Sequence, residues 1–170
     1  MLTLKSLKKL DLLTKERLKL VNYLNDNLKD IEGIKIPVKR NNSTHVYYRY
    51  ALKIDLDRIR IKAPLFASAL NAEGMDFYVG YMRPLYLQPL YQNKILYGDK
   101  GCPFTCPYYK GNVDYSKGIC PNAELLEDIV ISTEIVRPPQ TIEDMDDIIY
   151  AIKKVLSNKD ELLKRYPREG

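Results

Sequence analysis

Three cysteines lie within one irregular segment of the chain, and cysteine thiolates are good ligands for zinc. Cys102, Cys106 and Cys120 are each followed by proline and form the pattern Cys-x3-Cys-x13-Cys. A tetrahedral zinc site needs a fourth donor, for which Asp99, Asp114 or water is the local candidate. The thiols also fit one disulfide beside one free thiol, or three structural thiols that meet without a metal. We expect the structural thiols and keep the other two as alternatives.

His45 is the one histidine of the sequence and its only imidazole for acid–base chemistry. It begins a stretch, residues 45–54, whose aromatic and β-branched residues predict a strand. Neither a nucleophile elbow nor a glycine-rich turn is nearby, so a Ser-His-Asp arrangement is not expected. Glycine-rich loops that cradle phosphate are also absent from the sequence. We expect no catalytic residue in this chain.

The segment from Tyr81 to Tyr91 is the most distinctive in the chain. It contains two prolines, which restrict the backbone, and three tyrosines, which supply large contact areas. Arg83 adds a guanidinium suited to a carboxylate or a phosphate. Such a rigid loop suits the wall of a ligand site or a dimer interface. A surface loop packed on its own domain is the competing interpretation.

The charges are spread along the chain rather than clustered. Twenty-seven Lys and Arg against twenty-two Asp and Glu give a net charge of +5, but the basic pairs lie on stretches with helical periodicity, as solvated helix faces do. No nucleic-acid-binding signature occurs, and no apolar run approaches the ~20 residues that cross a bilayer. The opening residues do not form a signal sequence. We therefore expect a cytoplasmic protein without a nucleic-acid or membrane partner.

Hydrophobic periodicity predicts a long helix at the start of the chain. From Leu4 to Ile31 apolar residues recur at helical spacing, with one interruption at Arg17. About thirty residues is long for a helix of a small free-standing domain, so we expect its first half to contact something outside this chain. Gly33 then ends the helix, and residues 34–37 suit a short strand that stops at proline.

Short strands and helices alternate along the rest of the chain. Ile59 and Ile61 alternate with charged residues, which predicts an edge strand, and further strands are expected at residues 75–79 and 129–136. Pro64 suits the start of a helix, residues 122–128 suit another, and Thr141 with Asp144 predicts the capped start of a closing helix.

This order of elements predicts an α+β fold. We expect a small antiparallel or mixed sheet with helices on one face, preceded by the long helix. The expected organisation is a connecting or interface helix over residues 1–31, an α+β domain over 32–158 and a charged tail over 159–170. The cysteine-containing loop occupies residues 98–121 of that domain.

Six segments resemble, in order and spacing, those of one enzyme family. They are Leu7-Lys8-Lys9-Leu10-Asp11 with Arg17, His45-Val46-Tyr47-Tyr48, residues 69–75, Tyr81 with residues 84–86 and 88–89, Cys120-Pro121-Asn122-Ala123-Glu124, and Pro138-Pro139 with the helix that follows. Together they resemble the carboxy-terminal part of the DegT/DnrJ/EryC1/StrS family of pyridoxal phosphate (PLP) dependent aminotransferases, which act largely on nucleotide-linked keto-sugars. The implied fold is that of the carboxy-terminal domain of fold-type I PLP transferases.

The resemblance implies a role on the substrate side of such an enzyme. In the family, the Schiff-base lysine, the acid that pairs with the pyridine nitrogen and the phosphate-holding loop lie upstream of the segments matched here. We therefore expect a fragment or split subunit that is inactive alone and provides substrate and dimer contacts beside a PLP-binding large domain. Tyr81, Arg83, His45 and Tyr48 are expected to bind the sugar or its nucleotide phosphates. No residue here is expected to bind PLP.

Two departures and two alternatives accompany the resemblance. Tyr48 and Tyr86 stand where many relatives have histidine, which leaves the identity of the sugar open. A stand-alone, non-catalytic binding or regulatory module would keep the fold without the chemistry. In the second alternative, the chain is a small cysteine-metal protein that shares only its architecture with the aminotransferase family. A neighbouring gene for the lysine-bearing half would argue against the first alternative, and a metal assay would test the second.

Overall fold

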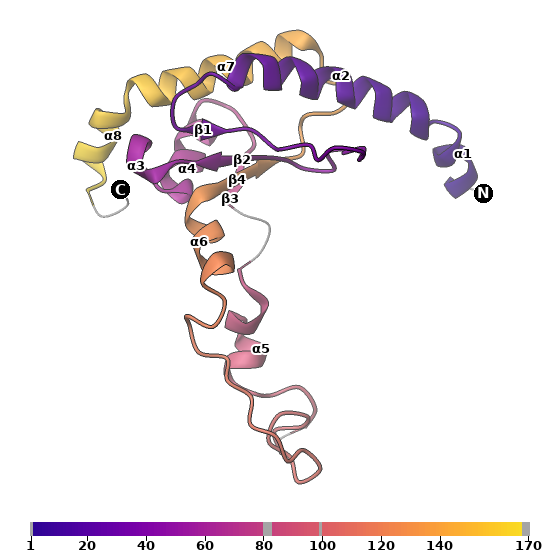
Figure 1. Ribbon diagram of the computed structural model, residues 1–170, viewed down its shortest axis with the longest axis vertical. Coiled ribbons are helices and arrows are strands. Elements are labelled where there is room, and N and C mark those ends of the chain that lie inside the picture. The colour runs from indigo at the N-terminus through magenta and orange to yellow at the C-terminus, as the bar shows by residue number, and fades with distance from the viewer. Residues whose placement is uncertain (1, 80–82, 99, 168–170) are drawn as a thin grey trace.

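The computed structural model describes residues 2–79, 83–98 and 100–167, and these residues form an α+β fold around one sheet (Figure 1). The strands are β1 (Ile34–Lys35), β2 (Tyr50–Ile54), β3 (Tyr78–Val79) and β4 (Val130–Thr133). They lie in the order β1-β2-β4-β3, and every neighbouring pair is antiparallel. The α+β class and the small antiparallel sheet predicted from the sequence are confirmed.

The central strand β2 presents alternate residues to the core. Tyr50, Leu52 and Ile54 are buried, whereas Lys53 between them is exposed, which is the period-two pattern of a sheet with one covered face. The Tyr50 hydroxyl donates a hydrogen bond to Asn25 Oδ1 at 2.8 Å and so connects the sheet to the first long helix.

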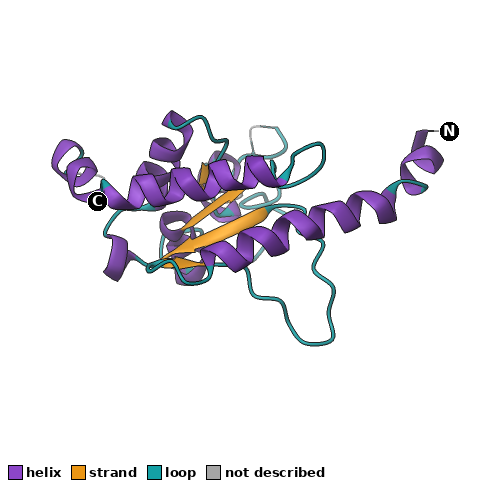
Figure 2. Ribbon diagram, turned by 90° about the horizontal axis from the view of Figure 1, so that it is seen from above, coloured by secondary structure: helices purple, strands orange, loops and turns teal. Residues whose placement is uncertain are grey.

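Three helices contribute most of the helical residues that are buried in the core. They are α2 (Leu10–Leu28), α4 (Ala63–Ala72) and α7 (Ile142–Ser157), and α2 and α7 lie alongside each other over the sheet (Figure 2). The predicted cap of α7 is confirmed, because the Thr141 hydroxyl accepts from the Asp144 N–H while the Asp144 carboxylate accepts from the Thr141 N–H. Fully buried side chains from these helices include Val21, Leu24, Phe66, Leu70, Met145 and Ile152.

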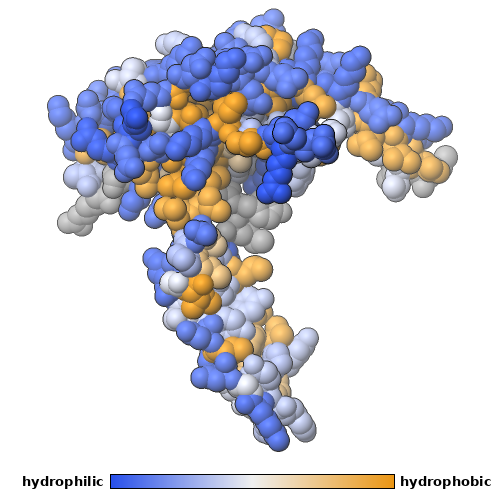
Figure 3. Space-filling model, in the orientation of Figure 1, coloured by the Kyte–Doolittle hydropathy of each residue, from blue (hydrophilic) through white to orange (hydrophobic). Residues whose placement is uncertain are grey.

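The long amino-terminal helix is divided into two pieces. A short helix, α1 (Leu2–Leu7), precedes α2, and only the second half of α2 is buried, through Leu20, Val21, Leu24 and Leu28. The first half of α2 and all of α1 project beyond the sheet, and α1 shows an apolar surface in Figure 3.

The strands expected at residues 34–37, 75–79 and 129–136 are present but shorter, as β1, β3 and β4, and two other strand predictions differ more from the structure. The expected strand over residues 45–54 is formed only from Tyr50 onward, because Tyr47 has a left-handed φ of 47° and its N–H bonds to His45 Nδ1 rather than to a neighbouring strand. The expected edge strand at Ile59 and Ile61 is wrong. Residues Leu56–Ile59 form a short helix, α3, because the Asp55 carboxylate accepts from the Asp57 N–H and starts a helical turn.

An arm projects from the body between β3 and helix α6 (Pro121–Ile129) (Figure 1). We define the arm as residues 83–120 apart from residue 99. Its outgoing limb contains η1 (Leu85–Leu87) and α5 (Pro89–Gln92), and residues 107–120 form the returning limb. The segment expected to be irregular, residues 98–121, includes the outer part of this arm and its returning limb, and ends at the first residue of α6. A short helix, α8 (Lys159–Arg165), lies in the charged tail.

Candidate functional site

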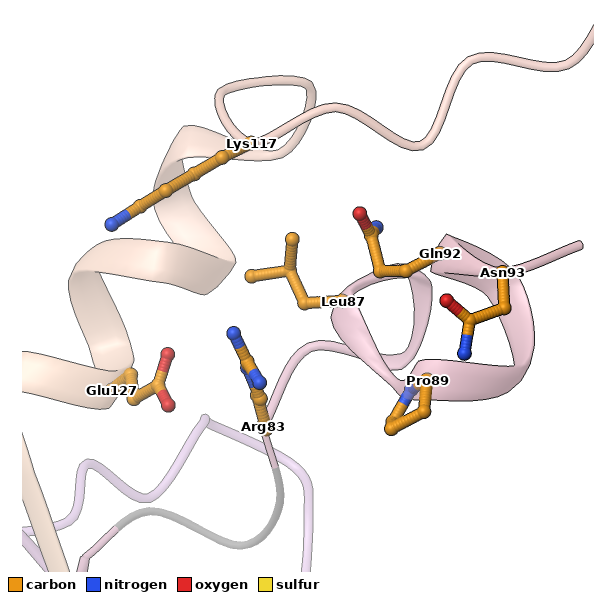
Figure 4. A pocket seen from close by; sticks show the side chains of 7 residues that line it. All are labelled: Arg83, Leu87, Pro89, Gln92, Asn93, Lys117 and Glu127. Carbon is orange, nitrogen blue, oxygen red and sulfur yellow. The ribbon is translucent and has the colours of Figure 1, made fainter.

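A groove of about 900 Å³ lies at the base of the arm, between the outgoing limb and α6 (Figure 4). Leu87 and Pro89 give it an apolar wall. Its polar lining consists of Arg83, Gln92, Asn93, Lys117 and Glu127. In Figure 4 the Leu87 side chain lies between those of Arg83 and Lys117, and the Glu127 carboxylate faces the Arg83 guanidinium. This volume is within the range of pockets that hold small organic ligands.

Glu124 joins the two limbs of the arm next to the groove. Its carboxylate accepts a hydrogen bond from the Tyr86 hydroxyl in the outgoing limb and one from the Gly118 N–H in the returning limb. The Tyr86 and Gly118 bonds hold the pKa of Glu124 below its usual range. Glu124 belongs to the first turn of α6, where a carboxylate also suits the helix dipole. The groove is therefore bounded by segments that share one anchoring side chain.

The Tyr86 hydroxyl keeps its proton to unusually high pH. Burial of the phenol raises its pKa most, the bond to Glu124 raises it further, and together they bring it to about 12. The folded state therefore binds this proton more tightly than the unfolded state, whose tyrosine titrates near pH ~10. The resulting stabilisation is complete below pH ~10 and is lost as the pH rises through about 12.

We expect Glu124→Gln to lower the pKa of Tyr86 part of the way from about 12 toward its ordinary value. The negative charge that favours the protonated phenol is removed, while burial of the ring remains. Ultraviolet titration of tyrosinate measures this, with Tyr86→Phe as the control that identifies the Tyr86 step among the other tyrosines. An alkaline titration that is identical in the wild type and Glu124→Gln would contradict the account.

Gln92 strengthens the same connection between the limbs. Its Nε2 donates to the Tyr86 carbonyl at 2.6 Å and to the Tyr115 carbonyl at 2.7 Å. Further out, the rings of Tyr91, Phe104 and Tyr115 pack together with centroid distances of 5.3 to 6.1 Å. The arm thus has an ordered interior, in which Tyr91 and Gln92 of the outgoing limb contact Tyr115 of the returning limb.

The cysteines adopt the arrangement that we had kept as an alternative. Cys102 and Cys106 form a disulfide at the tip of the arm, and Cys120 is a free, exposed thiol. The three thiols therefore do not act together, and the described part of the chain contains no group of three side chains placed to hold a metal. The structure thus disagrees with the expectation of three convergent thiols and with the zinc ligand set Cys102, Cys106 and Cys120, because two of these sulfurs are bonded to each other.

Thiol counting tests this arrangement. Without reductant, the native protein is expected to react with a thiol reagent at one position, Cys120, because the other two sulfurs are oxidised. Cys120→Ser should abolish the reaction, and reduction should make two further thiols reactive. Stoichiometric zinc together with three thiols that react only after unfolding would contradict it.

His45 and Tyr48 lie on the connection between β1 and β2 and do not line the groove. The His45 side chain is exposed, and its Nδ1 accepts from the Tyr47 N–H at 2.9 Å. Its ring is tilted against the Tyr47 ring, with the two ring centroids 4.0 Å apart. Tyr48 is 61% exposed. Arg17 in α2 donates to the Val46 carbonyl at 3.3 Å and fixes this connection to the body.

Among the described residues, Arg83, His45 and Tyr48, all expected to bind substrate, are therefore not gathered into one site. Arg83 lines the groove, whereas His45 and Tyr48 present their side chains from another segment. Tyr81 lies outside the described residues. Sequence reasoning did not place Lys117, Glu124 or Glu127 in a site, although Glu124 ends one of the segments that carry the family resemblance. The resemblance of the segment from Cys120 to Glu124 to the family was the sequence signal that could have identified Glu124.

The described residues include no helix that is both long and apolar enough to cross a membrane.

Comparisons with known proteins agree with the resemblance. Residues 1–115 match the model of the DegT/DnrJ/EryC1/StrS aminotransferase family. The chain is 28% identical over 151 residues to the uncharacterized protein MJ1066 of Methanocaldococcus jannaschii, covering 89% of this chain and 34% of that protein. It is 22% identical over 159 residues to the spore coat polysaccharide biosynthesis protein SpsC of Bacillus subtilis, covering 94% of this chain and 36% of SpsC.

The fold is also that of solved aminotransferase structures. The crystal structure of DesI, determined in the presence of its TDP-sugar product, superposes with a TM-score of 0.72 at 16% identity, over 96% of this chain and 36% of DesI. The chain thus spans about a third of the length of the relatives it matches. With a family match over more than half of its residues, the chain belongs to the DegT/DnrJ/EryC1/StrS aminotransferase family.

Proposed function

We propose that this chain is the carboxy-terminal small domain of a PLP-dependent nucleotide-sugar aminotransferase. It would act beside a larger PLP-binding part, on the same polypeptide or on a separate subunit. The observation that supports the proposal comes from the alignments. They include nearly all of this chain but only about a third of each relative. DesI was crystallised with a TDP-sugar product and SpsC is named for polysaccharide biosynthesis, which supports a nucleotide-linked sugar as the substrate class.

The role of the domain is to bind and orient the substrate. Arg83 offers a forked guanidinium for phosphate oxygens. Because His45 Nδ1 accepts a hydrogen bond, the neutral ring carries its proton on Nε2, which can donate to a sugar hydroxyl. The exposed Tyr48 hydroxyl can donate or accept in the same way. Tyr81 is proposed as a further contact on the basis of the family resemblance alone.

PLP would be held by the larger part of the enzyme. A lysine that reacts with PLP is activated by desolvation or by a neighbouring cation, and no lysine among the residues that the structure describes is buried. These residues therefore offer no desolvated lysine for a covalent PLP site. When bound, PLP supplies the electron sink for transfer of the amino group. The domain itself would supply substrate contacts and contacts within a cytoplasmic homo-oligomer.

Reconstitution tests the proposal. The purified chain is mixed with a PLP-binding large domain of the family, and amino transfer to a nucleotide-linked keto-sugar is followed with glutamate and glutamine as donors. Turnover by the mixture that neither component shows alone is expected. Turnover by this chain alone would contradict the proposal, as would a mixture no more active than the large domain. The second outcome would favour a non-catalytic binding module.

A further inference from the structure

The disulfide at the tip of the arm closes a short loop, residues 102–106, which we call the disulfide loop. Its two cysteines are four residues apart. The Gly101 carbonyl accepts from the Phe104 N–H at 2.8 Å, and it also accepts from the Thr105 N–H at 2.9 Å. Gly101 has a left-handed φ of 69°, and a Cβ at this position would overlap the Thr105 hydroxyl. Glycine therefore permits the turn, and the disulfide closes it.

The disulfide loop holds Phe104 against both limbs of the arm. Phe104 lies between the two cysteines in the sequence and is only 8% exposed. Its ring centroid is 6.1 Å from that of Tyr91 in the outgoing limb and 5.9 Å from that of Tyr115 in the returning limb. The bond between the cysteines therefore constrains the side chain at which the outer parts of the two limbs meet.

The effect of this bond is confined to the tip. Closing so short a loop restricts the unfolded chain less than closing a long one would, so the bond contributes little to the stability of the whole domain. The base of the arm is held without cysteines, because Glu124 accepts from the Tyr86 hydroxyl and from the Gly118 N–H. Opening the disulfide loop would release the tip and leave the base in place.

Disulfides of cytoplasmic proteins are usually transient and often serve to sense redox conditions. We propose that the Cys102–Cys106 disulfide is a redox switch that orders the tip of the arm when oxidised and loosens it when reduced. The proposal takes from the proposed function only the cytoplasmic setting. It does not depend on aminotransferase activity.

The reductant of the switch is a dithiol, such as a protein of the thioredoxin class. Cys102 is partly exposed, whereas Cys106 is 4% exposed, so a thiolate of the reductant attacks the Cys102 sulfur. The bond between the two cysteines breaks, and Cys106 leaves as a thiolate that takes a proton from water. The second thiolate of the reductant then attacks the mixed disulfide at the reductant's own sulfur and releases Cys102. The chain gains two electrons and two protons, and the reductant becomes a disulfide.

Exposed tyrosines at the tip form the surface that the switch controls. Tyr97 is 69% exposed, and its N–H donates to the Cys102 carbonyl at 3.1 Å. Tyr108 is 93% exposed, and the N–H of the next residue, Tyr109, donates to the Cys106 carbonyl at 3.0 Å. Exposed tyrosines are typical of contact surfaces between proteins. The oxidation state of the cysteines thus determines how these tyrosines are presented.

Hydrogen exchange followed by mass spectrometry tests the ordering of the tip in the full chain. After reduction with dithiothreitol, we expect amides of residues 100–109 to exchange about tenfold faster or more, and those of residues 117–124 to exchange as before. Cys102→Ser/Cys106→Ser should exchange like the reduced chain with or without reductant. Cys120→Ser, which changes only the free thiol, should respond to reductant as the wild type does. Equal exchange in both redox states would overturn the proposal, as would faster exchange that extends to residues 117–124.

Equilibration with glutathione tests whether the bond is reversible in the folded chain. Buffers of increasing ratio of reduced to oxidised glutathione are used, free thiols are trapped, and circular dichroism confirms that the chain stays folded. We expect a reversible passage from disulfide to dithiol within this range, with Cys120→Ser following the wild type. A bond that survives excess reduced glutathione would be a permanent structural link and would contradict the switch, as would thiols that fail to form the bond again. Neither measurement needs PLP or turnover, so the switch and the proposed enzyme can fail separately.

Discussion

Replacing Leu7 and Leu10 by serine is expected to convert a self-associating chain into a monomer. Leu4, Leu7, Leu10 and Leu13 lie on the projecting part of α1 and α2 and are 65%, 63%, 52% and 43% exposed. Burial of a whole leucine contributes about 1.5–3 kcal/mol, so burying what remains exposed of the four contributes about 3–7 kcal/mol before the costs of association. Soluble monomers rarely expose contiguous apolar surface without a partner for it.

The double substitution removes about half of that contribution, which corresponds to a loss of tenfold or more in affinity at about 1.4 kcal/mol per tenfold. Sedimentation velocity over a range of concentrations measures the association. Leu125→Ser is the matched control, because Leu125 is 49% exposed but lies on α6. A wild-type chain that stays monomeric at high concentration would contradict the prediction, as would association that Leu125→Ser disrupts equally.

Phe66→Ala is expected to destabilise the domain by about 3–5 kcal/mol, the range for removing a buried phenylalanine ring. Phe66 lies in α4 and is fully buried in the core that connects the sheet to α2 and α7. The loss is a large part of the ~5–15 kcal/mol that stabilises an ordinary domain. Urea unfolding followed by circular dichroism measures it, with Phe66→Leu as the control that keeps most of the volume. A shift below about 1 kcal/mol for Phe66→Ala would show that α4 does not pack as described.

The sequence predicted best those elements whose signals are local. The capping box at Thr141 and the apolar periodicity after it specified α7, and Pro64 marked the start of α4 within one residue of its observed first residue, Ala63. Both signals depend on neighbours within one or two turns of helix. The helix of residues 122–128 was likewise found within one residue at each end, as Pro121–Ile129.

The strand predictions that failed concern segments where local hydrogen bonds compete with strand formation. Residues 45–49 have the composition of a strand, but the bond from the Tyr47 N–H to His45 Nδ1 holds the backbone in a turn. Ile59 and Ile61 are both buried, as two-residue alternation predicted. They reach the core from the end of a short helix and the segment after it, because Asp55 caps that helix. The alternation of apolar and charged residues correctly predicted that both side chains are buried. It predicted the wrong secondary structure for their backbone.

The candidate site was only partly predictable for a different reason. Arg83 was identified because prolines and tyrosines mark its loop as rigid. Lys117 and Glu124 acquire their roles only because the arm folds back on itself and brings Gly118 and Tyr86 to the same carboxylate. No local pattern specifies that pairing, since Tyr86 and Glu124 are 38 residues apart. The thiols differ in this respect, because the paired Cys102 and Cys106 are only four residues apart, yet the residue types alone allowed three arrangements.

Trapping of PLP in the reconstituted enzyme tests the central claim most directly. The mixture of this chain and a PLP-binding large domain is reduced with borohydride, which fixes PLP to the lysine that holds it, and the labelled peptide is identified by mass spectrometry. The account predicts label on one lysine of the large domain and none on this chain, whose lysines are all at least partly exposed to solvent. Stoichiometric label on a single lysine of this chain would contradict its assignment as the substrate-side domain.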